Sequence, residues 1–262
     1  KYITRRFIPA KLQDNPYLMQ TDDYYAMLSS LPEVQRKQFL NGDWDAFSNA
    51  AFSEFDRDVH VVEPFDIPKG WQRFRAADWG YSSPACCLWF AIDYDNNLWV
   101  YRELYTQKIT ADVFARKVID LEHGEYIRYG VLDASTWARR GDVGPSIAET
   151  MIQAGCRWRP SDRTPRSRIS GKLEIHKRLK VEDKEPGIRI FSNCRNLLRT
   201  FPTLPLDDSN PEDINTHVED HAYDALRYGC MSRPMHTSYA NKAFGNSNRT
   251  TNFVPSDKIF GY

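Results

Sequence analysis

The sequence of 262 residues contains no apolar run that approaches the ~20 residues needed for a membrane-spanning helix. It also lacks a charged amino-terminal region followed by an apolar core, which is the pattern of a secretory signal. Both absences argue against membrane insertion and secretion, so we expect a cytoplasmic protein with no membrane partner. With 41% hydrophobic residues, the chain can still bury a sizeable core.

An excess of charge of one sign is also missing, because 35 Lys and Arg residues balance 35 Asp and Glu residues. Without a net charge there is no overall attraction to nucleic acid, so any DNA contact must come from a local basic patch. The five cysteines are scattered and include no C-x-x-C pair, which argues against zinc and favours reduced, packed thiols. His217 and His221 are four residues apart, but no Glu follows His217 as in the H-E-x-x-H zinc motif.

A third absence concerns nucleotide hydrolysis. No G-x-x-x-x-G-K-[ST] phosphate-binding loop occurs, since Gly171 and Lys172 lack the upstream glycine and are followed by Leu173. The sequence therefore carries no ATPase site of that type.

Apolar runs and helical periodicities from residue 73 onward predict an α/β domain. The predicted strands cover residues 73–78, 85–93, 98–105, 129–133 and 187–191. The predicted helices follow Thr110, cover residues 145–154 and 193–201, and surround Asp224. The Asp and Asn residues at positions 94–97 suit a tight hairpin, whereas the later strands are reached through helices. A hairpin beside crossover connections predicts a mixed β-sheet flanked by helices.

Three aspartates are notable for their positions. Asp78 and Asp133 each end an apolar run typical of a buried strand, and Asp224 lies in a predicted helix. Taken singly, an Asp at a strand end is most often a turn former or a helix cap, and Asp224 falls on the polar side of its helix. If the first and fourth strands are neighbours, however, Asp78 and Asp133 meet, and two close carboxylates repel unless a cation lies between them. Oxygen ligands favour Mg²⁺ or Mn²⁺.

These motifs, together with residues 5–18 and 40–45, resemble the nuclease domain of the large terminase subunit of tailed double-stranded DNA phages. The resemblance implies the ribonuclease H-like fold. It also implies a metal-dependent endonuclease that cuts concatemeric double-stranded DNA with little sequence specificity, by two-metal phosphodiester hydrolysis. The implied ligands of two Mg²⁺ or Mn²⁺ ions are Asp78, Asp133 and Asp224, and His221 joins them in the catalytic site.

The resemblance and the local sequence patterns together predict three parts in the chain. Residues 1–50 would be an arm from an ATPase motor that lies outside this sequence, with two helices between residues 22 and 40. Residues 51–233 would form the nuclease domain, and residues 234–262 a flexible tail. The implied partners, in the host cytoplasm, are double-stranded DNA, the ATPase domain of the same full-length protein, the small terminase subunit and the portal protein.

Two assignments within the site stay open. Asp220 precedes Asp224 by about one helical turn, so either could provide the third ligand; the resemblance favours Asp224, the second Asp of D-H-x-x-D. His221 either orders a metal-bound water, protonates the leaving oxygen, or is a hydrogen-bonded packing residue. Glu103, at the end of the third strand, is expected to form an edge-strand salt bridge rather than to bind metal.

Basic residues far outnumber acidic ones between residues 157 and 184. Interleaved Pro, Ser, Thr and Gly residues indicate a mobile loop or ribbon that leads into a helix from about Lys172. Backbone phosphates are the natural partners of such a segment, although a charge run is a solvated surface in most proteins. The residues expected to contact DNA are Arg166, Arg168, Lys172 and Arg178.

Two other functions stay open. A catalytically weak DNA-binding or portal-docking module would keep the fold without efficient cleavage, and a resolvase or transposase would use the fold for another reaction. Residues 5–45 resemble terminase and argue against a resolvase or transposase. Three converging carboxylates favour cleavage over docking alone, because such a cluster is costly to maintain.

Overall fold

A computed structural model describes Tyr17, Leu28 and residues 49–139, 144–182 and 185–235 of the chain. Within these residues, no helix is both long and apolar enough to cross a membrane. The helices expected between residues 22 and 40 lie outside the described part, apart from the helical and buried Leu28. The tail expected from residue 234 also lies outside it beyond Met235.

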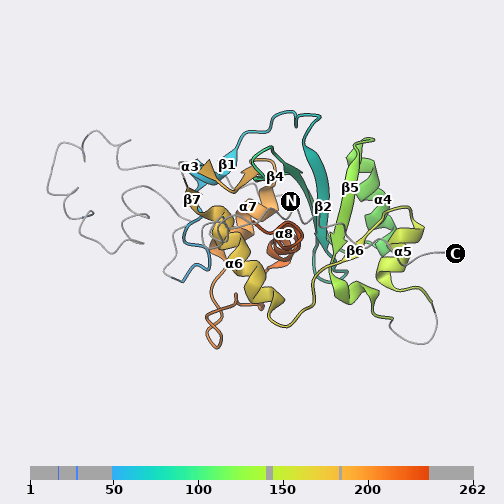
Figure 1. The fold of residues 1–262 in the computed structure, drawn as a ribbon. Helices are drawn as coiled ribbons and strands as arrows, with labels where there is room; N and C mark the ends of the chain where they lie inside the picture. Colours follow the sequence, from blue (N-terminus) through green and yellow to red (C-terminus); the bar gives the residue numbers. More distant parts are fainter. Residues whose placement is uncertain (1–16, 18–27, 29–48, 140–143, 183–184, 236–262) are drawn as a thin grey trace, which may run out of the picture.

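A seven-stranded mixed β-sheet forms the centre of the domain (Figure 1). Its strands lie in the order β1-β9-β4-β3-β2-β5-β6, and a separate hairpin joins β7 to β8. The pairs β2–β3 and β3–β4 are antiparallel, whereas the other neighbours in the large sheet are parallel. The bounds are β1 Val61–Val62, β2 Gln72–Asp78, β3 Ala85–Ile92, β4 Leu98–Thr106, β5 Ile127–Leu132, β6 Arg159–Pro160, β7 Val181–Glu182, β8 Glu185–Pro186 and β9 Ile188–Phe191.

Helices cover both faces of the sheet. Figure 1 shows α4 and α5 on one side, and α6, α7 and α8 on the other. Their bounds are α3 Arg57–His60, α4 Ala111–Glu122, α5 Ile147–Gln153, α6 Ser167–Leu179, α7 Arg195–Thr200 and α8 His221–Met231, with short 3-10 helices η3 Ala134–Trp137 and η4 Phe201–Thr203. The predicted α/β class and mixed sheet are therefore confirmed.

The basic segment differs from its prediction, because α6 begins at Ser167, well before the expected start at Lys172. Gly171, Ile175 and Leu179 recur every four residues and are buried along one side of the helix. This narrow face packs α6 against α8. The helical pattern is hard to recognise in the sequence because most residues of the segment are charged or polar. The segment from Ser167 is thus a docked helix rather than a mobile ribbon.

Glu103 also has a different role from the one expected. Its strand β4 lies between β9 and β3, so it is not an edge strand. The Glu103 carboxylate accepts hydrogen bonds from the backbone N–H groups of Asn196 and Leu197, at 3.0 and 2.7 Å. A carboxylate there satisfies free N–H groups in the first turn of α7. Glu103 is therefore a capping residue for that helix.

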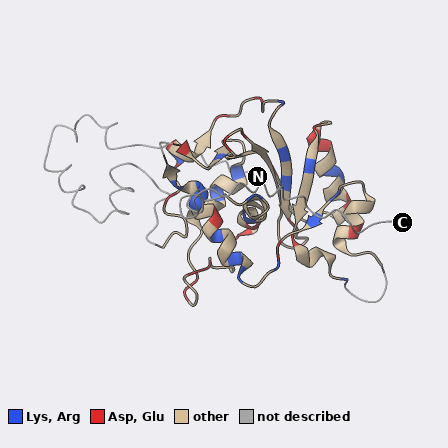
Figure 2. Ribbon diagram, viewed as in Figure 1, with Lys and Arg blue, Asp and Glu red and all other residues tan. Residues whose placement is uncertain are grey.

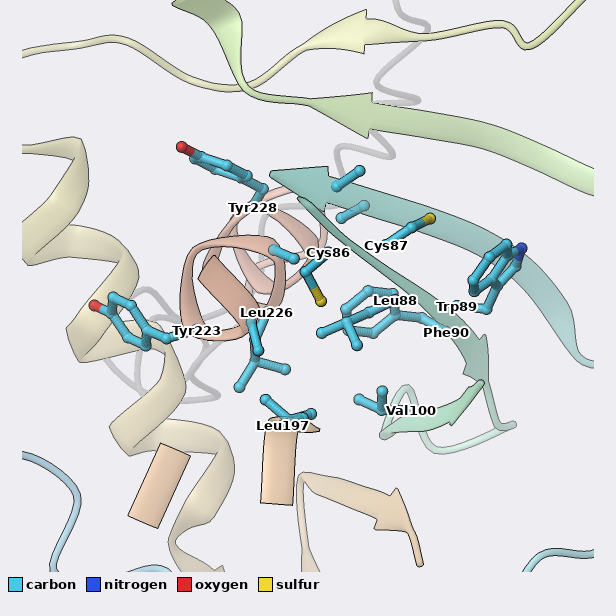
Figure 3. Close-up of a cluster of buried hydrophobic side chains, with 14 of the residues drawn as sticks. Cys86, Cys87, Leu88, Trp89, Phe90, Val100, Leu197, Tyr223, Leu226 and Tyr228 are labelled. Carbon is cyan, nitrogen blue, oxygen red and sulfur yellow. The ribbon is translucent and has the colours of Figure 1, made fainter. Parts of the chain in front are cut away.

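The core beneath α8 determines how closely this helix approaches the sheet. Figure 3 shows Leu226 of α8 with Cys86 and Leu88 of β3, beside Leu197 of α7. These four side chains are at most 1% exposed. Gly229 faces Phe90, and a Cβ atom built on Gly229 would lie 2.3 Å from the aromatic ring. The glycine therefore permits the close contact between α8 and β3.

We expect Gly229→Ala to lower the free energy of unfolding by about 1–3 kcal/mol, because the added methyl group overpacks the Phe90 contact. Urea denaturation measures the change. The sign is diagnostic, since alanine in place of glycine inside an exposed helix stabilises by about 1 kcal/mol. A more stable Gly229→Ala protein would contradict this packing.

Candidate metal centre

Two of the three aspartates meet at one edge of the sheet. Asp78 is the last residue of β2, and Asp133 directly follows β5. The two strands are parallel neighbours with Ala77 opposite Leu132, and the N–H of Asp133 donates to the carbonyl of Ala77 at 3.1 Å. The condition for Asp78 and Asp133 to meet, that the first and fourth predicted strands are neighbours, is therefore fulfilled.

Helix α8 brings further groups to the same edge. Nδ1 of His221, the first residue of α8, lies 2.9 Å from Oδ2 of Asp78 and donates a hydrogen bond to it. The hydroxyl of Tyr228 donates to Oδ1 of Asp133 at 3.4 Å. Asp224 lies between these two helix positions. One helix thus contacts both strand-end carboxylates.

Asp224 itself is 9% exposed, unlike the solvated residue that the helical pattern alone indicates. Its side of α8 is covered by α6, which packs closely because Gly171 has no side chain against Arg227. Asp220, directly before α8, is equally buried. Both candidates for the third ligand therefore lie in the same acidic cluster.

Burial and neighbouring charges change the protonation of this cluster. Burial raises the pKa of Asp78 to about 7; the hydrogen bond from His221 opposes this shift, and the charges of Asp224 and Asp133 add to it. Burial likewise raises the pKa of Asp220 to about 6, with a further contribution from Asp224. The hydrogen bond with Asp78 raises the pKa of His221. Such mutually repelling carboxylates are the environment that a cation would stabilise.

Two of the three carboxylates, those of Asp78 and Asp224, each keep one oxygen that no hydrogen bond or ion pair of a described residue reaches. Among the described residues, hydrogen bonds and ion pairs reach only Oδ2 of Asp78 and only Oδ1 of Asp224. Asp133 instead uses both oxygens on Ser135 and caps η3, so the general interpretation of a strand-end Asp as a cap also applies to it.

No group of three His, Cys, Asp or Glu side chains within the described part of the chain is arranged to hold one ion. Mg²⁺ seldom requires such a group, because it is usually bound by one or two carboxylates together with waters and substrate phosphates. The two carboxylates of Asp78 and Asp224, each with one oxygen that no hydrogen bond or ion pair of a described residue reaches, are donors of this kind.

Sequence reasoning missed the arginine beside Asp224. Nε and Nη2 of Arg227 lie 2.9 and 2.8 Å from Oδ1 of Asp224, and Nη1 of Arg168 lies 3.5 Å from the same oxygen. The available signal was spacing, because an Asp and an Arg three residues apart share a helix face. The Arg168 contact joins residues distant in sequence, so periodicity could not reveal it.

The four basic residues expected to contact DNA have different environments. Arg166 is exposed at the start of α6, and Arg168 is partly exposed while it pairs with Asp213 at 2.9 Å. Lys172 is 6% exposed, and Arg178 is fully buried with hydrogen bonds to backbone carbonyls that include that of Gly187. The prediction is therefore corrected for Lys172 and Arg178, whose side chains are not on the surface. Figure 2 shows the Lys and Arg positions of α6 in blue, on the side of the sheet that also carries α8.

Comparison with solved structures identifies the class of fold. The nuclease domain of the phage P22 large terminase is 18% identical with a TM-score of 0.58, and the match covers 71% of this chain and 93% of that domain. A large terminase from a thermophilic bacteriophage, solved in complex with ATP-γ-S, is 15% identical with a TM-score of 0.57. That match covers 84% of this chain but 54% of the ATP-γ-S-bound terminase, so the chain spans about half the length of that protein.

The large terminase nuclease of the thermophilic phage G20c, solved with bound cobalt, is 14% identical with a TM-score of 0.52, and the match covers 70% of this chain and 97% of that one. No protein-family model and no curated protein matches the sequence. The mixed sheet and the similarity to these solved structures show that the chain has the ribonuclease H-like α/β fold. Within that class, its similarity is to phage large terminase nuclease domains, as the sequence motifs predicted.

Proposed function

We propose that this chain is the nuclease domain of a viral genome-packaging terminase and a metal-dependent endodeoxyribonuclease. The observation that carries the proposal is the position of Asp78 and Asp133 at the ends of two neighbouring parallel strands, with Asp224 of α8 near enough for its charge to raise the pKa of Asp78. Similarity of fold to nuclease domains, one of them with bound cobalt, supports the same function. The substrate would be concatemeric double-stranded DNA, cut by phosphodiester hydrolysis with little sequence specificity.

The three aspartates would hold two Mg²⁺ or Mn²⁺ ions, whose chemistry there is activation of a water and stabilisation of the leaving 3′-oxygen. His221 is fixed through Nδ1 by Asp78, which leaves Nε2 as the nitrogen that can exchange a proton. Its side chain is 22% exposed, so solvent or a leaving group can reach it. We assign His221 to proton transfer at the leaving oxygen or to orientation of a water.

The proposal extends to partners. The ATP-γ-S-bound large terminase is about twice as long as the part of it that matches this chain, which supports an ATPase domain in the same full-length protein. The small terminase subunit and the portal protein would complete the packaging machine in the host cytoplasm. The division into an arm of residues 1–50, a nuclease domain of residues 51–233 and a tail of residues 234–262 belongs to this proposal.

Conversion of supercoiled plasmid tests the function. We expect nicked and linear DNA with Mn²⁺ or Mg²⁺ and none with EDTA. Asp224→Ala should abolish conversion, whereas Asp220→Asn should retain it if Asp224 is the third ligand. The opposite pattern would assign that role to Asp220. Failure to cut with either metal, together with salt-sensitive DNA binding, would favour the docking module.

DNA binding should depend on the exposed Arg166. Because one phosphate contact contributes about 0.9 to the slope of log affinity against log salt, Arg166→Gln should reduce that slope by about this amount. Anisotropy of a labelled duplex at several NaCl concentrations measures the slope. Arg116→Gln is the matched control, since Arg116 is exposed on α4 at the other face of the sheet. Equal slopes for both variants would remove Arg166 from the DNA-contacting surface.

A further inference from the structure

We propose that Arg227 is a positioning residue for Asp224, an inference that rests on the nuclease function proposed above. Arg227 lies about one turn after Asp224 on α8, and its side chain is 5% exposed. Both Nε and Nη2 contact the same oxygen, Oδ1, at 2.9 and 2.8 Å. The planar guanidinium thus fixes one carboxylate oxygen by two donors, which a lysine ammonium on a flexible stem does not reproduce.

The contacts to Asp224 are one-sided. Within the described residues, every hydrogen bond and ion pair of its carboxylate goes to Oδ1, including the 3.5 Å contact from Arg168. Oδ2 is thereby left for a ligand of another kind. Asp78 follows the same scheme, because His221 donates to its Oδ2 and no hydrogen bond or ion pair from a described residue reaches its Oδ1. Donors that hold one oxygen and orient the other are typical partners of metal-ligating carboxylates.

Arg227 is itself held in place. A Cβ atom on Gly171 of α6 would lie 2.4 Å from Cγ of Arg227, so the arginine stem fills the space that the glycine leaves. The guanidinium carbon also lies 4.5 Å from the centre of the Tyr228 ring. Packing from two sides restricts the arginine rotamer. A restricted arginine can transmit its orientation to the carboxylate that it holds.

A positioned Asp224 matters because its neighbours repel it. The negative charges of Asp224 and Asp133 both act on Asp78, and Asp224 also acts on Asp220. Without the Arg227 contact, the Asp224 carboxylate could rotate away from these acids and carry Oδ2 out of the site. The arginine therefore opposes the repulsion that would otherwise disperse the acidic cluster before a cation arrives.

Titration calorimetry of Mn²⁺ into the metal-free protein, without DNA, tests this role. Arg227→Lys keeps the positive charge and removes the two-donor contact, so the dissociation constant should rise about 10- to 100-fold, as for other outer-shell partners of metal ligands. Arg75→Lys is the matched control. Arg75 is 5% exposed and pairs with Glu122 of α4 at 2.5 Å, on the other side of the sheet.

Both variants should unfold at lower temperature than the wild type, but only Arg227→Lys should bind Mn²⁺ more weakly. Gly171→Ala, which displaces the arginine stem without changing any charge, should also weaken binding and serves if Arg227→Lys does not fold. Wild-type affinity in Arg227→Lys, or in Gly171→Ala in that case, would show a purely structural ion pair and overturn the inference. A wild-type protein that neither binds Mn²⁺ nor cuts DNA would overturn the proposed function itself.

Discussion

Asp78→Asn is expected to reduce DNA cleavage by about 10³-fold or more, because it removes one of the three proposed metal ligands. If Asp78 binds metal as proposed, its loss removes several kcal/mol of transition-state stabilisation, and each ~1.4 kcal/mol is a factor of ten in rate. Asn keeps the size of the side chain and can still accept the hydrogen bond from His221. The loss would therefore come from charge rather than from packing.

The rate of plasmid nicking at saturating Mn²⁺ measures this effect. Asp112→Asn is the control, because Asp112 is an acid in the first turn of α4 on the opposite face of the sheet. It should cleave at the wild-type rate. Near-wild-type cleavage by Asp78→Asn would remove this aspartate from the reaction, and the proposed centre with it.

The strands of the sheet could be predicted because each one is indicated by a short stretch of sequence. Strand β3 is an unbroken run of eight buried residues, and the turn before β4 contains the Asp and Asn residues that a hairpin favours. The apolar stretch before Asp133 similarly indicates β5. These runs place Asp78 and Asp133 at strand ends. That the two strands are neighbours was implied only by the ribonuclease H-like arrangement, and the structure shows them paired.

The surroundings of Asp224 could not be predicted in this way. Helical periodicity places Asp224 on a polar face, and only the packing of α6 over that face buries it. That packing depends on Gly171 facing Arg227, a contact between residues more than fifty positions apart. In the same packing, the helix that was expected from about Lys172 begins at Ser167, and Arg178 is buried rather than on the surface. Tertiary packing here overrides the local pattern.

Stability of the metal-free protein should fall as the pH rises from about 4 to 8, and Asp78 should be the main cause. Its pKa is 3.8 in an unfolded chain and about 7 in the folded state. Between these values the folded state holds a proton that the unfolded state has lost, so the free energy of unfolding decreases with pH. The pKa of His221 is also raised above 6.5, so its contribution is likewise lost above that pH.

The pKa difference of about three units for Asp78 corresponds to at most ~4 kcal/mol of lost stability above pH 7. Urea denaturation in EDTA at pH 5, 6.5 and 8 measures the trend for the wild type and for Asp78→Asn. The variant lacks the titrating carboxylate, so its stability relative to the wild type should increase with pH. A constant difference between the two proteins across this range would contradict a raised pKa at Asp78.

Added Mn²⁺ should reverse the trend in the wild type at pH 8, because a cation binds the folded protein and favours the ionised carboxylate. At a Mn²⁺ concentration 100 times its dissociation constant, the gain should be about 2.7 kcal/mol, and Asp78→Asn should gain less. The substitution would thus stabilise the empty site while it removes cleavage. A buried carboxylate that costs stability without a cation, and is needed once a cation binds, is the pattern expected of a residue retained for catalysis rather than for folding.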